Sequence, residues 1–92
     1  MLFVICYDVS DDGRRRRLER VLLDFAHRVQ YSVFEGEMNE ARFQRMKRRA
    51  QRSIDPECDS LRFYRLCRKC RSAVEVYGLG PLPREEGELL VV

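Results

Sequence analysis

Apolar residues along this chain follow two different periods. Residues 2–7 (LFVICY) form an unbroken apolar run whose length suits a strand buried on both faces. A helical spacing of i, i+3, i+4 and i+7 follows at Leu18, Val21, Leu22 and Phe25. The polar stretch between them contains three residues of the types that cap helices, Ser10, Asp11 and Asp12. The pattern therefore predicts a strand that leads directly into an amphipathic helix.

The same two periods return in the next part of the chain. Residues 28–38 alternate between apolar and polar side chains, which predicts one strand or two short strands with a kink near Tyr31. Asn39 is a suitable cap for a second helix. The apolar stripe of this helix consists of Phe43, Met46, Ala50 and Ile54. Asp55 and Pro56 then end the helix.

Three further segments are predicted to be strands. Residues 61–66 alternate again, residues 73–77 follow a Cys-x-x-Cys turn, and residues 88–92 follow a glycine- and proline-rich linker. The predicted order, β-α-β(β)-α-β-β, is an α+β arrangement typical of the ferredoxin-like βαββαβ sandwich, here with an extra C-terminal strand. We expect residues 1–78 to form this domain, and residues 79–92 to be a linker and strand that packs on a partner subunit.

Chain length and apolar content limit the class of protein. A chain of 92 residues builds one domain with a modest core, and sheet proteins of this size often complete their core by forming a homodimer. No apolar run reaches the roughly 18 residues that a membrane span requires. The first apolar run is too short for a signal peptide and has no basic residue before it. We therefore expect a cytoplasmic protein that does not bind membranes.

Arginine dominates the basic residues and is clustered. Sixteen of the 18 basic residues are arginine, and 11 of the 18 lie within residues 14–20 and 42–52. A solvated helix surface is the simpler explanation for any single arginine. The clusters together favour a nucleic-acid backbone as ligand, because the planar guanidinium contacts phosphates bidentately. The candidate nucleic-acid-binding arginines on the two helices are Arg14, Arg15, Arg16, Arg17, Arg42, Arg45 and Arg49.

Asp8 lies where the first strand leaves the core for solvent. A carboxylate at this place is either an ordinary turn acid or a ligand for a hard cation such as Mg²⁺, which retains several waters and needs only one or two carboxylates. Two Asp8 side chains at the two-fold axis of a dimer would form a site for phosphodiester hydrolysis. For Asp11 and Asp12, helix capping is favoured over metal binding.

The four cysteines do not follow a zinc-ligand pattern. Cys67 and Cys70 form a lone Cys-x-x-Cys, and His27 is the single histidine of the sequence. A structural zinc site needs four ligands. We rank reduced thiols in a turn first, a disulfide that tightens the turn second, and a metal shared between subunits third. Cys6 belongs to the first apolar run and is interpreted as a small apolar side chain.

Four segments, in this order and spacing, resemble one protein family: VICYDVSDD, the basic first helix, RVQYSVFEGEM, and LRFYRLCRKC followed by VEVYG. They are similar to the smaller of the two universal CRISPR adaptation proteins, a family of small ferredoxin-like, metal-dependent endoribonucleases. The resemblance covers residues 1–78. It implies a homodimer in which each subunit contributes Asp8 to a catalytic magnesium site, with Mn²⁺ as the alternative metal.

The resemblance also implies partners. In this family the dimer lies along the double-stranded DNA that is inserted during spacer acquisition and bridges two dimers of a larger integrase, which predicts a heterohexamer. Single-stranded RNA is the alternative nucleic acid. Two functions from different classes therefore remain. One is a metal-dependent phosphodiesterase that acts through Asp8, and the other is a non-catalytic DNA-binding adaptor in which Asp8 is structural.

In the second motif, the resemblance places Arg28, Ser32 and Phe34 at the nucleic-acid cleft. Each of them also has a simpler structural role. An aromatic residue in a strand is more often a core residue than a base-stacking platform. Ser32 can be an ordinary polar strand residue, and Arg28 can pair with Glu35 or Glu37.

Overall fold

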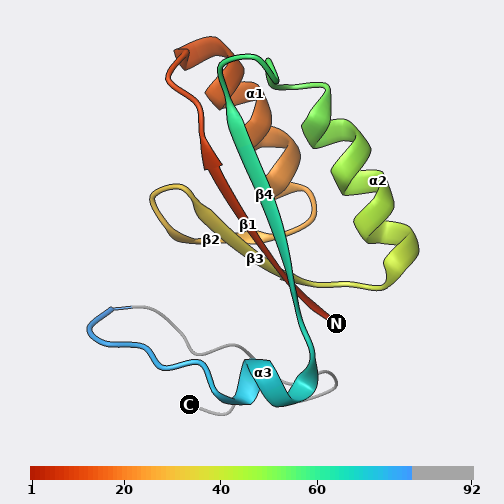
Figure 1. Ribbon diagram of the computed structural model, residues 1–92, viewed down its shortest axis with the longest axis vertical. Helices are drawn as coiled ribbons and strands as arrows, with labels where there is room; N and C mark the ends of the chain where they lie inside the picture. Colours follow the sequence, from red (N-terminus) through yellow and green to blue (C-terminus); the bar gives the residue numbers. More distant parts are fainter. Residues whose placement is uncertain (80–92) are drawn as a thin grey trace.

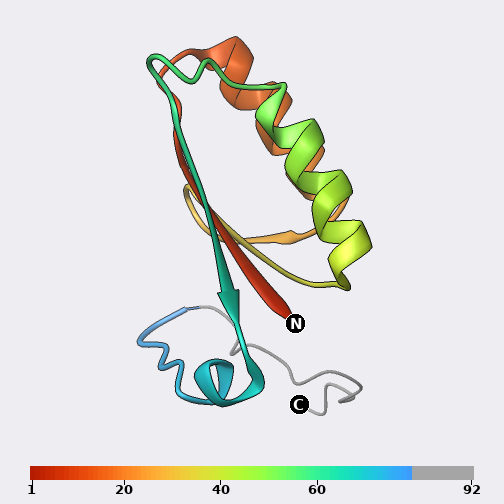
Figure 2. The same ribbon diagram turned by 45° about the vertical axis from the view of Figure 1, so that its right-hand side comes forward.

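The computed structural model describes residues 1–79, which form a four-stranded antiparallel sheet with two long helices on one face (Figures 1 and 2). The strands are β1 (Leu2–Asp8), β2 (His27–Gln30), β3 (Val33–Glu37) and β4 (Ser60–Leu66). The helices are α1 (Asp12–Leu23), α2 (Glu40–Gln51) and the short α3 (Arg68–Ser72). The strand order β2-β3-β1-β4 places β1 in the interior of the sheet. This βαββαβ arrangement confirms the predicted ferredoxin-like fold.

Both long helices begin where a capping residue precedes the apolar stripe. The Asp11 carboxylate accepts a hydrogen bond from the backbone N–H of Arg14 at 2.8 Å. The Asn39 side chain accepts one from the backbone N–H of Arg42, also at 2.8 Å. Each bond satisfies a donor that the first helical turn leaves without a partner. No helix of residues 1–79 is long and apolar enough to cross a bilayer.

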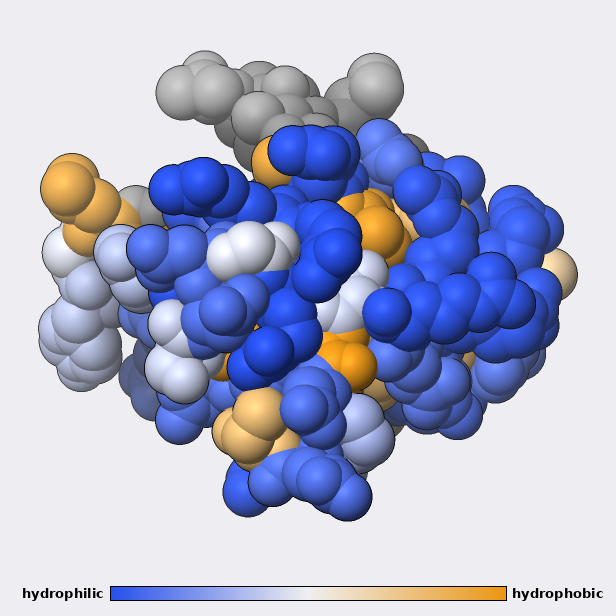
Figure 3. Space-filling model, turned by 90° about the horizontal axis from the view of Figure 1, so that it is seen from above, coloured by the Kyte–Doolittle hydropathy of each residue, from blue (hydrophilic) through white to orange (hydrophobic). Residues whose placement is uncertain are grey.

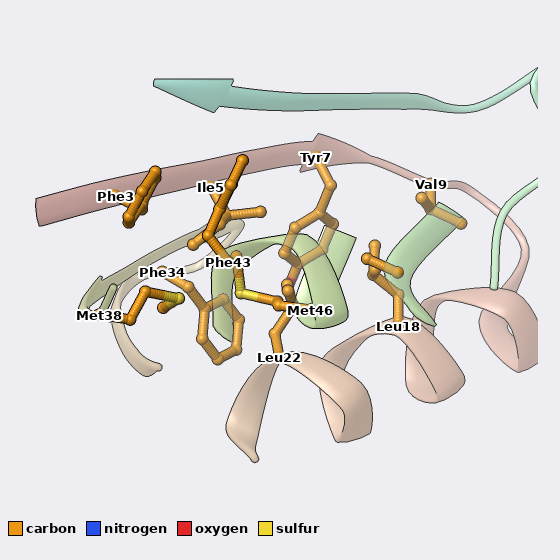
Figure 4. Packing of buried hydrophobic residues seen from close by; sticks show 11 residues of the cluster. Phe3, Ile5, Tyr7, Val9, Leu18, Leu22, Phe34, Met38, Phe43 and Met46 are labelled. Carbon is orange, nitrogen blue, oxygen red and sulfur yellow. The ribbon is translucent and has the colours of Figure 1, made fainter. Parts of the chain in front are cut away.

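The hydrophobic core lies between the sheet and the two long helices (Figure 4). Phe3, Ile5 and Tyr7 alternate along β1, point toward the helices and are at most 5% exposed. The helices contribute Leu18, Leu22, Phe43, Met46 and Ala50. The rings of Phe3 and Phe43 are stacked, with centroids 4.1 Å apart. Both predicted apolar stripes are therefore confirmed.

Residues 28–38 contain two short strands and not one long strand, which confirms the second of the two predicted alternatives. β2 and β3 are antiparallel neighbours, and Tyr31 and Ser32 form the turn between them. Their pairing contains an irregularity between Arg28 and Gln30. A turn at this position reverses the chain, so that β3 can pair with the full apolar run of β1.

The strand predicted at residues 73–77 is wrong. The Cys-x-x-Cys segment forms the start of α3, with Cys67 as its N-cap and Cys70 inside the helix, and residues 73–79 form neither helix nor strand. Val76 and Tyr77 are 38% and 93% exposed. Apolar alternation gives a stable strand only beside a pairing partner, and none of the four described strands pairs with this segment. The strand predicted at residues 88–92 lies outside the described residues.

Gly36 of β3 packs closely against the end of α1. A Cβ at this position would lie 2.8 Å from the terminal methyl of Met38, 3.0 Å from the Ala26 Cβ and 3.0 Å from the Phe25 carbonyl oxygen. We expect Gly36→Ala to lower the free energy of unfolding by about 1–3 kcal/mol, the usual cost of overpacking. Gly13→Ala is the matched control for urea unfolding. A Cβ there would be 3.4 Å from its nearest neighbour, and alanine is favoured within a helix. Equal stability of the two variants would contradict this prediction.

Candidate nucleic-acid interface and carboxylate site

Asp8 lies at the exposed end of β1, on the sheet face that the helices do not cover. It shares this face with Val4 and Cys6, because alternate residues of a strand point the same way. In the sheet register Asp8 is opposite Ser60 of β4. Among residues 1–79, no ion pair engages its carboxylate. Asp8 is therefore an accessible negative charge on a rigid strand end.

Residues 1–79 of a single chain do not assemble a complete metal site. Within the described range, 1–79, no three His, Cys, Asp or Glu side chains gather closely enough to hold a metal ion. Asp11 is engaged as the cap of α1, and the Asp12 carboxylate lies 2.5 Å from Arg15. The contacts of Asp11 and Asp12 therefore give no support for metal binding by either residue. The Asp8 carboxylate is exposed and has no ion-pair partner in residues 1–79, and it suits Mg²⁺ only as half of a site that a second chain completes.

Arg14 supports the strand end on which Asp8 lies. Its Nε and Nη2 atoms lie 2.8 and 3.2 Å from the two carboxylate oxygens of Asp59. The Asp59 side chain is fully buried and also accepts a hydrogen bond from the backbone N–H of Asp55. The hydrogen bonds from Arg14 and Asp55 lower the pKa of Asp59, so that it stays ionised. This pair joins α1 to the loop before β4.

Arg28 belongs to a polar cluster centred on Glu19 of α1. Its Nη2 lies 3.0 Å from the Glu19 Oε2, and the Tyr7 hydroxyl donates to the same oxygen at 2.5 Å. The predicted pairing of Arg28 with Glu35 or Glu37 is therefore wrong. Burial and the hydrogen bond to Glu19 raise the pKa of Tyr7, which keeps the phenol a neutral donor. This cluster fastens β2 to α1.

Phe34 is a core residue of β3. Its side chain is fully buried, and its ring centroid lies 6.1 Å from that of Tyr7. The guanidinium of Arg28 covers the ring at 5.3 Å. Phe34 therefore has the alternative role of a core residue, and in this conformation its buried ring cannot stack on a nucleic-acid base. Ser32 is half-buried in the β2–β3 turn, where its carbonyl accepts the Tyr7 N–H at 3.2 Å.

Arg42 and Arg49 hold α2 against the end of α1. The Arg42 Nη2 donates to the Asp24 carbonyl oxygen at 2.7 Å, and the Arg49 Nη2 lies 3.1 Å from the Asp24 carboxylate. Both guanidiniums also lie over the ring of Phe25, at 4.6 and 5.4 Å from its centroid. Cations over an aromatic ring are attracted by its electron-rich face. These two arginines therefore serve helix packing.

Six other arginines are exposed on the two long helices and at the C-cap of α2, and we call them the basic helix face. They are Arg16, Arg17, Arg20, Arg45, Arg48 and Arg52. Among the described residues, no side-chain ion pair engages any of them. Because α1 and α2 lie on the same side of the sheet, their outward sides form one surface (Figure 2). Figure 3 shows hydrophilic residues over most of the end where α1 begins and α2 ends.

The basic helix face overlaps only partly with the predicted set of arginines. Arg16, Arg17 and Arg45 were predicted from their clusters and lie on this face. Three more arginines on it were absent from the predicted set: Arg20, Arg48 and Arg52. Successive residues of a helix are rotated by about 100° around its axis. On this scale the three arginines lie opposite the apolar stripe of their helix, and this position identifies them as outward-facing.

Comparisons with known proteins identify the family. A family model described as CRISPR associated protein Cas2 matches residues 1–74. The chain is 38% identical, over 98% of both sequences, to CRISPR-associated endoribonuclease Cas2 3 of Synechocystis. Among solved structures it is similar to Streptococcus pyogenes Cas2, with 37% identity, a TM-score of 0.72, and coverage of 85% of this chain and 100% of that chain. It is also similar to a chain of a partial Cas6-RT-Cas1–Cas2 complex, with 25% identity, a TM-score of 0.76, and coverage of 99% and 98%. These matches confirm the resemblance noted in the motifs, and the chain belongs to the CRISPR-associated Cas2 family.

Proposed function

We propose that this protein acts in CRISPR adaptation as a homodimer that binds double-stranded DNA and assembles with a larger integrase. The observation that carries the proposal is the basic helix face. Its six arginines have no ion-pair partner in residues 1–79, whereas other arginines of the same helices hold the fold together. A surface of unpaired guanidiniums suits the regularly spaced phosphates of a duplex. The similarity to a chain of a Cas1–Cas2 complex supports an integrase of the Cas1 type as partner.

The uncovered face of the sheet supports the homodimer. Val4, Cys6, Val33 and Leu66 are half-buried there, and Tyr64 is 46% exposed. Apolar side chains in a row on an open sheet are favourable to bury against a second copy. Asp8 lies on this same face, so a two-fold axis near the end of β1 would bring two Asp8 carboxylates together. Without a cation, two such carboxylates would repel each other.

The second part of the proposal is phosphodiester hydrolysis, on RNA or DNA, at this pair of carboxylates. Mg²⁺, or Mn²⁺ in its place, would be held by Asp8 of each chain and would supply a Lewis acid and an activated water. The chain supplies a rigid ligand position, because Asp8 ends a strand paired to β4 and lies beside the Arg14–Asp59 pair. The name of the Synechocystis relative supports RNA as substrate. The alternative function is a non-catalytic adaptor.

Reconstitution tests the adaptation role. The protein, its cognate integrase and a short DNA duplex should form one complex that contains two copies of this chain, as measured by light scattering. We expect insertion of the duplex into target DNA only when this chain is present, because the dimer bridges the integrase subunits. Integrase and duplex without this chain are the control. Equal insertion with and without the chain would contradict the proposal.

A further inference from the structure

We propose that a small pocket beside Arg71 binds a carboxylate carried on a short aliphatic chain. The sheet register forms the pocket, because Leu2 at the start of β1 lies between Glu37 of β3 and Leu66 of β4. The helix α3 follows β4 in the chain and brings Arg71 to the same corner of the sheet. Asp8 lies at the opposite end of β1, so the pocket is separate from the proposed metal site (Figure 1).

Arg71 has a buried donor that its partner in the fold does not satisfy. Its side chain is 5% exposed, and its Nη1 donates to one carboxylate oxygen of Glu37. The other Glu37 oxygen lies 2.6 Å from the terminal ammonium of Met1. The Arg71 Nε is also buried, but it has no hydrogen-bond acceptor in residues 1–79. A buried N–H of a charged group without an acceptor is unfavourable, because it has lost its hydration without gaining a new bond.

One edge of the Arg71 guanidinium has the geometry that binds a carboxylate. In this group the Nε–H and one N–H of Nη2 point the same way, whereas Nη1 lies on the other side. Among the described residues, the hydrogen bond from Arg71 to Glu37 uses only Nη1, so the edge with Nε and Nη2 can donate two parallel hydrogen bonds to another acid. Arg65 differs, because its Nη1 and Nη2 already hold both oxygens of Glu40, at 2.5 and 2.9 Å. Arg65 is therefore the matched control for Arg71.

The size and lining of the pocket limit its ligand. The volume is about 180 Å³, below the roughly 300–1,000 Å³ of pockets for drug-sized ligands, so only a small group fits. The lining residues are Met1, Glu37, Leu66, Cys67, Arg68 and Arg71. Their cations outnumber the one acid, which favours an anion, while Leu66 and the free thiol of Cys67 form a less polar wall. A carboxylate on a short aliphatic chain meets both requirements, whereas phosphate has no apolar part.

Binding can be measured by NMR on the isotope-labelled full chain, with butyrate as the probe. We expect the Arg71 Nε–H signal to shift progressively as butyrate is added, with a dissociation constant on the order of 1 mM, because the Nε–H gains an acceptor. The Arg65 Nε–H signal should not move. Butyramide, which is neutral, and sodium phosphate at equal ionic strength should leave the Arg71 signal nearly unchanged. An Arg71 signal that does not respond to butyrate, or that responds equally to butyramide or phosphate, would overturn the proposal.

Arg71→Lys should weaken butyrate binding at least about 10-fold, because lysine keeps the charge but has no pair of parallel N–H groups. Arg65→Lys makes the same change at an arginine outside the pocket and should bind butyrate as the wild type does. Equal weakening by the two variants would contradict the proposal. The Arg71 signal of the wild type tests it even where Arg71→Lys does not fold.

A free acid and a glutamate side chain share the chemistry of the proposed ligand. Three glutamates of this chain, Glu85, Glu86 and Glu88, lie outside the described residues. If one of them is the natural ligand, replacing all three by glutamine should remove a competitor and tighten butyrate binding. Unchanged binding would assign the pocket to a free acid.

Discussion

Asp8→Asn should lower the rate of magnesium-dependent cleavage of labelled RNA or DNA by more than about 100-fold. Loss of a residue that only contacts a metal ligand usually costs about 10- to 100-fold, and loss of the ligand itself should cost more. Asparagine has nearly the same size as aspartate but lacks the negative charge that holds a divalent cation. The carboxylate is exposed and engaged by no ion pair in residues 1–79, so its loss should leave the fold intact. Initial rates with and without Mg²⁺, together with thermal unfolding, measure both effects.

Asp12→Asn is the control for this experiment. It makes the same change in charge four residues further along, at an exposed acid that is paired with Arg15. Cleavage by this variant should stay within a few-fold of wild type. Duplex binding by Asp8→Asn should be unchanged, because Asp8 and the basic helix face lie on opposite sides of the sheet. A wild-type protein that does not cut, or an Asp8→Asn variant that cuts equally well, would leave only the adaptor function.

Duplex DNA binding should weaken at least about 10-fold when Arg16 and Arg20 are both replaced by glutamine. Both side chains project from α1 and have no ion-pair partner in the described residues, so their guanidiniums are available for contacts with phosphates. The slope of log K against log salt is negative, and each lost phosphate contact reduces its magnitude by about 0.9, which gives a reduction of up to about 1.8 per chain. Fluorescence anisotropy at several salt concentrations measures the affinity and the slope. Glutamine is a good helix former, so α1 should persist.

The matched control removes two positive charges elsewhere. Arg68→Gln with Lys69→Gln changes the net charge equally, but on α3, away from the two long helices. If the basic helix face is the DNA footprint, this control should bind DNA nearly as well as wild type and keep its salt slope. Equal weakening by the two double variants would mean that net charge alone determines binding. The proposed footprint on α1 and α2 would then be wrong.

Local patterns were sufficient to predict most of the fold. Both long helices combine a capping residue with an apolar stripe, and the apolar run of β1 occupies the interior of the sheet. The segment 73–77 has apolar alternation too, but alternation describes the two faces of a strand and not whether a neighbour exists. Pairing partners are a property of the assembled sheet. That explains why this segment was predicted incorrectly.

The candidate site was harder to predict, because the sequence shows where arginines cluster but not which of them have partners. Arg14 and Asp59 are 45 positions apart, and the pair exists only because α1 lies beside the loop before β4. Arg28 has two nearby acids in the sequence, yet it pairs with Glu19 of α1. Helical position does distinguish inward from outward arginines, and this criterion identifies Arg20 and Arg48.

The packing of Arg42 and Arg49 over Phe25 has a consequence for the evolution of this chain. A contact with a ring face needs the flat, delocalised guanidinium, and lysine reproduces the charge but not the plane. On the basic helix face, a point charge is sufficient for contact with a phosphate. Exchange between arginine and lysine should therefore be tolerated at Arg16 or Arg20 and selected against at the two stacked positions. The basic residues of the chain are thus under two separate constraints: the architecture requires arginine at positions 42 and 49, whereas the ligand requires a positive charge on the basic helix face.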